Sequence, residues 1–298
     1  MSKTFTIFGV TGQQGGALVR YLLRNPAFSA IYRLRGVTRD ASKPAAVELR
    51  KRGVDIVEAN LDKPDTLRVA VRGSYAVFAV TNYWETAQAA VEVAQGKALA
   101  DAAVEEKVEF FIWSSLPPIG IPHFDSKAEV ERYIRTLPLT SVFFMPGWFM
   151  QNFQSVTKPR KITDEKYVLD PIIPSATAST RVPLIDIEDI GKYLAPALQD
   201  PPRYNHTRLF AATAFYTLAR ICRVWTECTN TEVVFEGADH AKKSTEAQEE
   251  GLSEDLGSGN LSYYGAEGEQ GVEWTIRQVQ EKLTTWEDFV KDHEPWFS

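Results

Sequence analysis

Hydrophobic and polar positions in the first half of the chain predict strands and helices in alternation. Residues 4–10 alternate β-favouring side chains before a run of glycines, whereas residues 14–24 place apolar side chains at helical spacing. The same pattern predicts further strands over residues 32–39, 54–60, 75–81, 108–115 and 140–147. It predicts further helices over residues 43–53, 63–73, 86–106 and 126–136. Such alternation is typical of a parallel sheet covered by helices on both faces.

The pattern becomes looser beyond residue 150. Residues 171–180 resemble a loop, and residues 180–198 and 206–225 each resemble a strand followed by a helix. Residues 237–268 are rich in glycine, serine and glutamate, which indicates a long exposed loop or a short insertion. The strict alternation is therefore confined to the first half.

Together these segments predict an α/β fold with two domains. We expect a Rossmann-type, doubly wound parallel sheet over residues 1–154, onto which residues 183–200 pack back. The remaining residues, 155–298, are expected to form a smaller, mixed α/β domain that binds a substrate or a partner.

Composition fits a globular protein and narrows its partners. With 298 residues, 44% of them hydrophobic, the chain can bury one large core, or one core and a smaller lobe. Its formal net charge of −6 disfavours the basic face that nucleic acids and anionic membranes require. We therefore expect no direct nucleic-acid partner and no membrane partner.

Cysteine content and apolar runs bear on the compartment. Cys222 and Cys228 are the only cysteines, so a disulfide framework is not indicated. The chain starts without a basic region followed by a long apolar segment, and no later stretch approaches ~20 uninterrupted apolar residues. These features predict a cytoplasmic protein, and a nuclear location is compatible with them.

Three glycines separate the first predicted strand from the first predicted helix. Gly9, Gly12 and Gly15 follow the spacing G-x-x-G-x-x-G. In a dinucleotide-binding turn such glycines allow a tight exit from the strand, close approach to pyrophosphate and packing of the helix, whose N-terminal N–H groups bind the anion. A turn without a ligand is the alternative, which the position of the array disfavours. The expected cofactor-binding residues here are Gly9, Thr11, Gly12, Gln13, Gln14 and Gly15.

Several motifs resemble those of the NmrA-like family, an atypical branch of the short-chain dehydrogenase/reductase superfamily. They are, in chain order, "FGVTGQQGGALVRYLL", "VTRD", "VTNYWE", "HFDSKAEVERYIR" and "PGWFMQNF". The likeness continues more weakly through "VPLIDIEDIGKYL". Separate motifs in the same order are more specific than glycines alone.

The end of the second predicted strand indicates which dinucleotide binds. An acidic side chain there binds the ribose diol of NAD, whereas an arginine accommodates the 2′-phosphate of NADP. Arg39 stands at this position, and Lys43 can add a second positive charge. A shift of one residue would instead present Asp40, and a solvated surface arginine is a further alternative. The resemblance favours NADP(H).

The ends of the third and fourth strands offer further cofactor contacts. The resemblance implies that Asn60, Leu61 and Asp62 border the adenine; alternatively, Asp62 caps the next helix. Ligands of open α/β sheets bind at the carboxyl ends of the strands. The residues expected there at the nicotinamide end are Thr81, Asn82 and Tyr83, although Tyr83 and Trp84 could instead pack beneath the cofactor.

The segment "HFDSK" only partly matches the catalytic segment of the superfamily. Ordinary short-chain dehydrogenases have a tyrosine proton donor and, four residues later, a lysine that holds the nicotinamide ribose. The resemblance places Lys127 at the lysine and His123 at the tyrosine. Histidine can donate a proton near neutral pH, so both are expected to be catalytic. Ser126 and Glu129, however, fit a capping box that would begin a helix at about Lys127 and leave His123 as a turn residue.

Residues after the fifth and sixth strands are candidates for the substrate pocket. Ser115, next to Ser114, lies near the superfamily's substrate-binding serine, or else caps the strand exit. The resemblance implies that the loop after the sixth strand contacts the nicotinamide. Trp148 is expected to bind substrate, and Phe149 and Asn152 the cofactor; a core helix would explain the same apolar residues.

Two functions fit these residues. The first is an NADP(H)-dependent oxidoreductase acting on a small carbonyl, imine or activated double bond, with Lys127 fixing the cofactor and His123 or water supplying the proton. The second is a non-catalytic NADP(H) sensor that binds a protein such as a transcription factor, which the missing tyrosine fits. The acidic run at Glu246, Glu249, Glu250, Glu254 and Asp255 could dock such a partner, or form a solvated loop. The histidines and cysteines show no zinc-site spacing, so no metal is expected.

Overall fold

The computed structural model describes residues 2–173, 176–237 and 263–297. These residues form two compact units that are each discontinuous along the chain. The first comprises Met1–Pro118, Pro122–Met145 and Ile190–Leu209. The second comprises Ile119–Ile121, Pro146–Asp189 and Phe210–Ser298. The acidic run from Glu246 to Asp255 lies outside the described residues.

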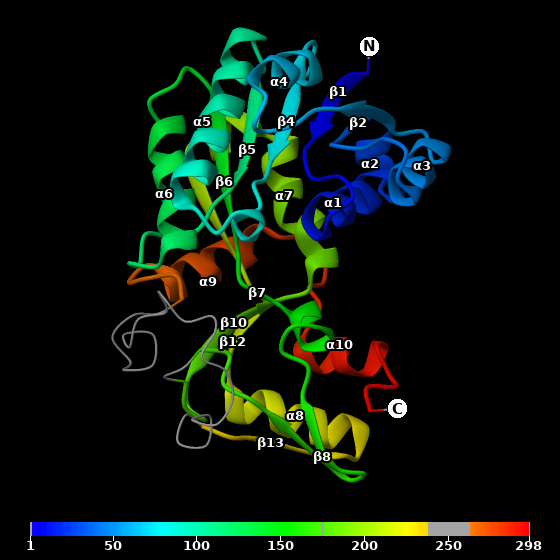
Figure 1. Cartoon of the computed structure of the whole chain (residues 1–298), viewed down its shortest axis with the longest axis vertical. Helices are drawn as coiled ribbons and strands as arrows, with labels where there is room; N and C mark the ends of the chain where they lie inside the picture. The colour runs from blue at the N-terminus through cyan, green and yellow to red at the C-terminus, as the bar shows by residue number, and fades with distance from the viewer. Residues whose placement is uncertain (1, 174–175, 238–262, 298) are drawn as a thin grey trace. The chain divides into compact units, whose positions relative to one another are not determined.

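A seven-stranded sheet is the centre of the first unit, in the order β11-β6-β5-β4-β1-β2-β3 (Figure 1). Its strands are β1 (Lys3–Ile7), β2 (Tyr32–Thr38), β3 (Asp55–Glu58), β4 (Ala76–Ala79), β5 (Phe110–Ser114), β6 (Thr140–Pro146) and β11 (Thr207–Ala211). Strands β1 to β6 pair in parallel, with β2 on one side of β1 and β4 on the other. The doubly wound, Rossmann-type sheet expected from the sequence is confirmed.

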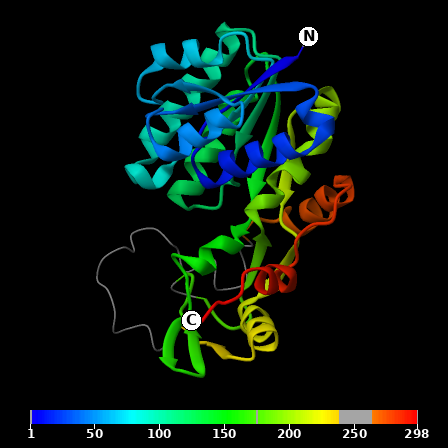
Figure 2. The ribbon, with the colours of Figure 1, turned by 90° about the vertical axis from the view of Figure 1, so that its right-hand side faces the viewer.

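Helices cover the sheet on both faces. They are α1 (Gln13–Arg24), α2 (Pro26–Ser29), α3 (Pro44–Lys51), α4 (Pro64–Val71), α5 (Ala89–Glu105), α6 (Pro122–Ile134) and α7 (Ile190–Gln199), with 3-10 turns η1 (Tyr83–Glu85) and η4 (Pro201–Tyr204). Helices α4, α5 and α6 pack side by side, over a core that includes Val77 and Trp113 (Figure 1). Helix α7 packs on α1 (Figure 2). The approach is so close that a Cβ on Gly191 would stand 2.0 Å from the ring of Tyr21.

Helix α6 begins earlier than the capping box predicts. Its first residue is Pro122 rather than Lys127, so His123 and Lys127 lie one turn apart on the same helix. Proline is compatible with the first helical position, because its fixed φ suits the helix and its missing N–H is not needed there. Ser126 does not cap the helix, because its hydroxyl donates to the buried carboxylate of Glu92 instead. The prediction of a helix start at Lys127 was therefore wrong.

The second unit is smaller and mixed, as expected. One sheet has the order β12-β10-β7 and the other β13-β9-β8, and each contains one parallel and one antiparallel pair. The strands are β7 (Trp148–Phe149), β8 (Arg160–Thr163), β9 (Lys166–Leu169), β10 (Arg181–Ile185), β12 (Ala214–Thr217) and β13 (Glu232–Phe235). The helices are η2 (Met150–Gln154), η3 (Ile187–Asp189), α8 (Leu218–Thr229), α9 (Gly268–Gln278) and α10 (Trp286–Asp292). Their shared core includes Phe153, Trp225 and Trp286.

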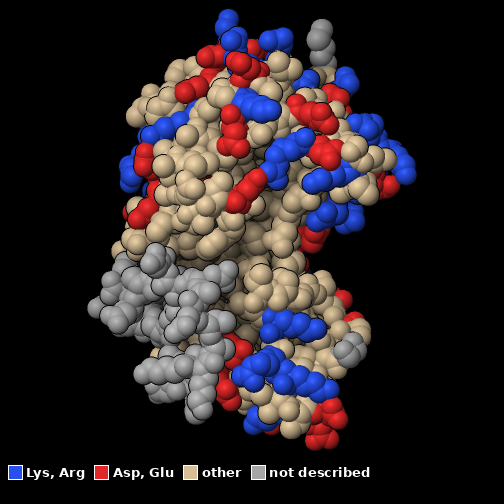
Figure 3. Space-filling view, viewed as in Figure 1, with Lys and Arg blue, Asp and Glu red and all other residues tan. Residues whose placement is uncertain are grey.

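Charged side chains are mixed on the surface of the first unit. On the face shown in Figure 3, Lys and Arg alternate with Asp and Glu over this unit and form no large patch of one sign. Within the described part of the chain, every helix is too short or too polar to span a lipid bilayer. Cys222 and Cys228 are free thiols.

Candidate functional site

The glycine turn connects β1 to α1 at the carboxyl edge of the sheet. Gly9 has φ +62°, a left-handed conformation that favours glycine, and its carbonyl accepts from the Gly12 N–H at 2.8 Å. A Cβ on Gly15 would stand 2.4 Å from that same oxygen. Thr11, Gly12 and Gln13 are exposed, and Gly12 caps α1 without a side-chain bond. The first N–H groups of α1 are therefore suited to bind an anion.

Arg39 follows β2 directly and lies on the surface. Its guanidinium forms an ion pair with Glu85 of η1, and both side chains are largely exposed. The neighbouring Asp40 is turned to its own loop, where its carboxylate accepts from the N–H and hydroxyl of Ser42. These hydrogen bonds lower the pKa of Asp40 below its usual value. Lys43 is the N-cap residue of α3. Arg39 is therefore the side chain of this loop best able to meet a phosphate.

The residues expected near adenine follow β3. The Asn60 side chain accepts from the Asp62 N–H at 3.0 Å, which shapes the turn, and Leu61 packs on the core under α4 to α6. Asp62 does not cap α4, whose N-cap is Lys63 without a side-chain bond. The Asp62 carboxylate instead accepts from the side chain of Gln95, on α5, at 2.7 Å.

A buried network of hydrogen bonds surrounds Lys127. Its ammonium donates to Glu92 Oε1 at 2.6 Å, to Thr81 Oγ1 at 3.0 Å and to the Thr81 carbonyl at 3.4 Å. The Thr81 hydroxyl donates to Glu92 Oε1 at 2.6 Å, and the Ser126 hydroxyl donates to Glu92 Oε2. Burial lowers the pKa of Lys127, and the carboxylate of Glu92 opposes that effect. The structure thus brings Lys127 and Thr81 together beside the carboxyl end of β4, and their contact with a cofactor stays a prediction.

Glu92 belongs to this network, and the sequence analysis did not identify it. It lies on α5, whose N-terminal half is rich in alanine, and its side chain is 2% exposed. An acidic residue on the buried side of an apolar helix is an available signal, because such a charge requires a partner. The partner, Lys127, is 35 residues away and follows another strand.

His123 lies among aromatic rings beside this network. Its ring centroid is 5.6 Å from that of Tyr83, 4.9 Å from Trp84 and 4.9 Å from Phe124. Burial, and secondarily the charge of Lys127, lower the pKa of His123 to about 4. Trp84 remains 69% exposed and so presents an open aromatic surface, whereas Asn82 is exposed at the start of η1.

Ser114 is the last residue of β5 and Ser115 follows it, and the hydroxyls of both serines bond to residues of the first unit. Ser114 donates to Gln14 Oε1 at 2.8 Å, which ties the end of β5 to the start of α1. Ser115 is fully buried and donates to Glu131 at 2.8 Å. Glu131 also pairs with two arginines, Arg135 and Arg208. Ser115 is thus placed in a buried ion cluster, and its role toward substrate remains a prediction.

The residues expected after β6 belong to the second unit. Trp148 and Phe149 form β7 and are half-buried, and Asn152 lies in η2. The alternative was an ordinary core helix. A short helix, η2, does form here, and its buried residues are Met150 and Phe153. The buried indole N–H of Trp148 has no partner among the described residues, which is the kind of donor that a bound molecule can satisfy. The predicted cofactor and substrate contacts of these residues remain predictions.

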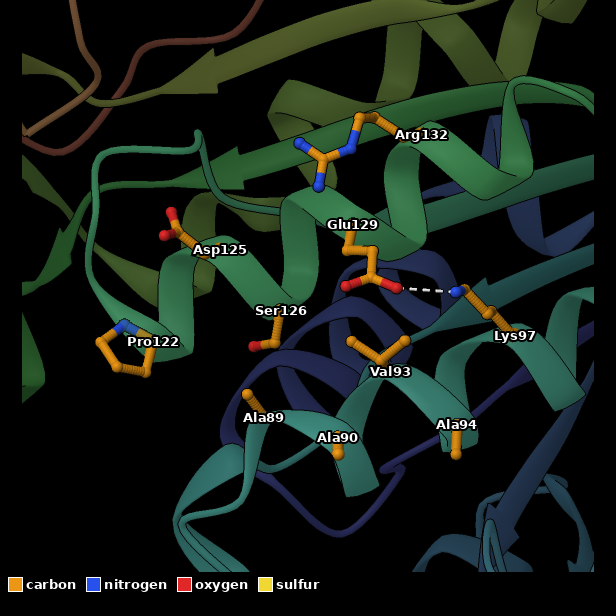
Figure 4. Close-up of a pocket in the computed structure, with 10 residues that line it drawn as sticks. All are labelled: Ala89, Ala90, Val93, Ala94, Lys97, Pro122, Asp125, Ser126, Glu129 and Arg132. Carbon is orange, nitrogen blue, oxygen red and sulfur yellow. Dashed lines mark hydrogen bonds and ion pairs between the residues drawn. The ribbon is translucent and has the colours of Figure 1, made fainter.

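A separate pocket of about 590 Å³ lies between α5 and α6 (Figure 4). Small side chains of α5, including Ala90 and Ala94, form one wall. Lys97 of α5 and Glu129 of α6 join across it at 2.7 Å. Ser126 lines the pocket, and Glu92 accepts its hydroxyl. Among the residues that the structure describes, no cluster of His, Cys, Asp or Glu is arranged to hold a metal ion.

Comparisons with known proteins agree with the motifs. The model of the NmrA-like family matches residues 1–290. An NmrA-like family domain-containing protein of Dictyostelium discoideum is 27% identical over 312 residues, covering 98% of both chains. The NmrA-like family domain-containing oxidoreductase lnaB of Aspergillus flavus is 30% identical over 224 residues, which are 68% of this chain and 66% of lnaB.

The fold has close counterparts among solved structures. The negative transcriptional regulator NmrA in complex with NADP is 20% identical, with a TM-score of 0.81 over 99% of this chain and 96% of NmrA. The same regulator has also been solved with NAD, with a TM-score of 0.82. At this identity the likeness concerns the fold.

Proposed function

The chain belongs to the NmrA-like family, and on this basis we propose that it binds NADP(H) and transfers hydride from NADPH to a small carbonyl, imine or activated double bond. One observation carries the proposal. The glycine turn follows β1, Arg39 follows β2, and Thr81 follows β4, where it accepts from Lys127 of α6. These strands are parallel, so the three features share one edge of the sheet. Because the strand order reverses between β1 and β4, this edge is where open α/β sheets bind ligands.

The residues at this edge fit the parts of NADP(H). The N–H groups at the start of α1 suit the pyrophosphate, and the absence of Cβ atoms at Gly12 and Gly15 keeps the turn compact. Arg39 would hold the 2′-phosphate, with Lys43 as a second positive charge. Lys127 would hold the nicotinamide ribose. When bound, the cofactor supplies the hydride.

The side chains near Lys127 suggest the rest of the reaction. The Lys127 ammonium provides positive charge where negative charge develops on the acceptor. The exposed ring of Trp84 offers a flat surface that suits a planar, conjugated acceptor. The proton comes from water in this proposal, because the neutral His123 is a poor acid at pH 7.

An NADP(H)-sensing regulator is the second candidate. It is favoured by the state of the catalytic segment: position 123 is a histidine with a lowered pKa, and Lys127 is already paired with Glu92. NmrA, which shares the fold, is a negative transcriptional regulator. A regulator of this kind would bind the cofactor without turnover.

Two measurements test the proposal. In thermal shift, a ligand at ~100 times its dissociation constant adds about 2.7 kcal/mol to stability, so NADP and NADPH should raise the melting temperature more than NAD does. NADPH oxidation is then followed with quinones, aromatic imines and aliphatic carbonyls. Tight NADPH binding without oxidation by any acceptor would reject the enzyme and leave the sensor.

Replacing His123 by phenylalanine is expected to change kcat/KM by less than about threefold, since a proton donor typically contributes 100-fold or more and the pKa of His123 near 4 leaves little imidazolium at pH 7. Phenylalanine keeps a ring against Trp84. Steady-state NADPH oxidation at pH 7 measures the effect. A fall of a hundredfold would assign the proton donor to His123.

The same variant should remove part of the acid sensitivity of the fold. The pKa of His123 is about 4 in the folded protein and near 6.5 when unfolded, so the unfolded state binds more protons between these values. Stability therefore falls as pH drops from about 6.5 towards 4. The melting temperature of His123→Phe should fall less over this range than that of the wild type; equal slopes would contradict this.

A further inference from the structure

The hydrogen bonds around Lys127 match a charged lysine facing a charged glutamate. An ammonium has three N–H donors, and those of Lys127 have three acceptors: Glu92 Oε1, Thr81 Oγ1 and the Thr81 carbonyl. The Thr81 hydroxyl accepts from Lys127, so its single proton is free to go to Glu92. Glu92 receives donors on both oxygens and donates to none of these groups. The pattern is the one expected for a carboxylate facing an ammonium.

Both charges are held away from water. The Lys127 side chain is 12% exposed and that of Glu92 is 2% exposed. A buried ammonium without a counter-charge tends to lose its proton, and a buried carboxylate tends to gain one. Each charge is therefore maintained by the other, and the Thr81 and Ser126 hydroxyls satisfy the remaining lone pairs of the carboxylate.

We propose that Glu92 is a positioning residue, which holds the Lys127 ammonium, in its charged form, at the carboxyl end of β4 where the nicotinamide ribose binds. This role rests on the proposed function. Because every Lys127 donor is engaged, a ribose hydroxyl must replace one of the three acceptors. The Thr81 carbonyl, at 3.4 Å, is the most weakly bound of them, whereas Glu92 at 2.6 Å is retained. Glu92 thus holds the Lys127 ammonium in place while the third N–H of Lys127 exchanges the Thr81 carbonyl for the ribose hydroxyl.

The pH dependence of cofactor binding separates this role from a merely structural one. Three neighbours of the Lys127 ammonium matter for its titration. They are Glu92 on α5, His123 on the same helix as Lys127, and the Trp113 ring on β5, whose centroid is 5.8 Å away. His123 is already neutral above pH 6. In Glu92→Gln the shape is kept and the counter-charge is lost, so burial lowers the pKa of Lys127 without opposition. Lys127 then loses its proton at a lower pH than in the wild type.

The experiment measures NADPH affinity of the full-length protein from pH 6 to pH 9, with circular dichroism to verify folding. For Glu92→Gln we expect affinity near that of the wild type at pH 6 and about tenfold weaker or more at pH 9, corresponding to a shift of at least one pKa unit. Glu92→Asp keeps the charge on a shorter arm, so it should bind about three- to tenfold more weakly at every pH, in keeping with a displaced ammonium. The matched control is Glu129→Gln, whose carboxylate pairs with Lys97. It should follow the wild-type profile.

Each outcome has a separate meaning. A loss in Glu92→Gln that is equal at all pH values, or wild-type affinity in Glu92→Asp, would overturn the positioning role. If Glu92→Gln does not fold, the Glu92→Asp affinity decides alone. Failure of the wild type to bind NADPH would instead remove the proposed function.

Discussion

Replacing Lys127 by methionine is expected to lower kcat/KM for NADPH oxidation by about 100- to 1000-fold, the usual effect of removing a charged group that stabilises developing charge. The Lys127 ammonium donates to Thr81, which lies two residues after the end of β4. Methionine has a similar length but neither charge nor donor. Steady-state and single-turnover kinetics measure the loss.

This variant also leaves the Glu92 carboxylate buried without its partner, which costs about 3–5 kcal/mol of stability. The double variant Lys127→Met/Glu92→Gln removes both charges and should recover most of the lost melting temperature. Its activity should stay as low as that of Lys127→Met. A double variant with restored activity would show that Lys127 acts only through folding.

Replacing Arg39 by glutamine is expected to weaken NADP binding by about 10- to 100-fold, because a hydrogen bond to a charged group contributes about 1.5–3 kcal/mol. NAD has no 2′-phosphate, so its affinity should change by less than about twofold on the same basis. Isothermal titration calorimetry of the wild type and Arg39→Gln with NADP and with NAD measures the loss of affinity for each cofactor. Equal losses for NADP and NAD would reject Arg39 as the residue that recognises the 2′-phosphate.

Replacing Glu85, the ion-pair partner of Arg39, should have the opposite effect on NADP affinity. In the structure it pairs with Arg39, so the 2′-phosphate must take its place. Because exposed ion pairs contribute about 0–1 kcal/mol, Glu85→Gln should tighten NADP binding by up to about fivefold and leave NAD unchanged. Arg52→Gln, an exposed arginine just after α3, is the control and should affect neither cofactor.

Much of the first unit could be predicted because its signals are local. Apolar spacing identifies the strands and helices, and the glycines mark a turn whose backbone leaves no room for a Cβ at Gly15. Strand β8 was missed because all four of its side chains are exposed, so it carries no alternation of apolar and polar residues.

The inner part of the site could not be predicted in the same way. Ser126 and Glu129 fit a capping box, but Ser126 instead donates to Glu92, a residue distant in sequence that the fold brings close. The low pKa of His123 likewise depends on burial and on its position one turn before Lys127, which the earlier start of α6 creates. Such contacts depend on packing, which a local pattern does not record.

The discontinuity of the first unit has a consequence for synthesis on the ribosome. Helix α7 and strand β11 come after residues 146–189, yet they cover α1 and complete the sheet beside β6. Until the chain has emerged beyond Ala211, β6 is paired with β5 alone and its other edge is open, and such an edge is prone to association with other chains. The nascent protein therefore passes through a long interval in which one edge of β6 is exposed, and the dinucleotide-binding sheet is completed only after residues 146–189 of the second unit have been made.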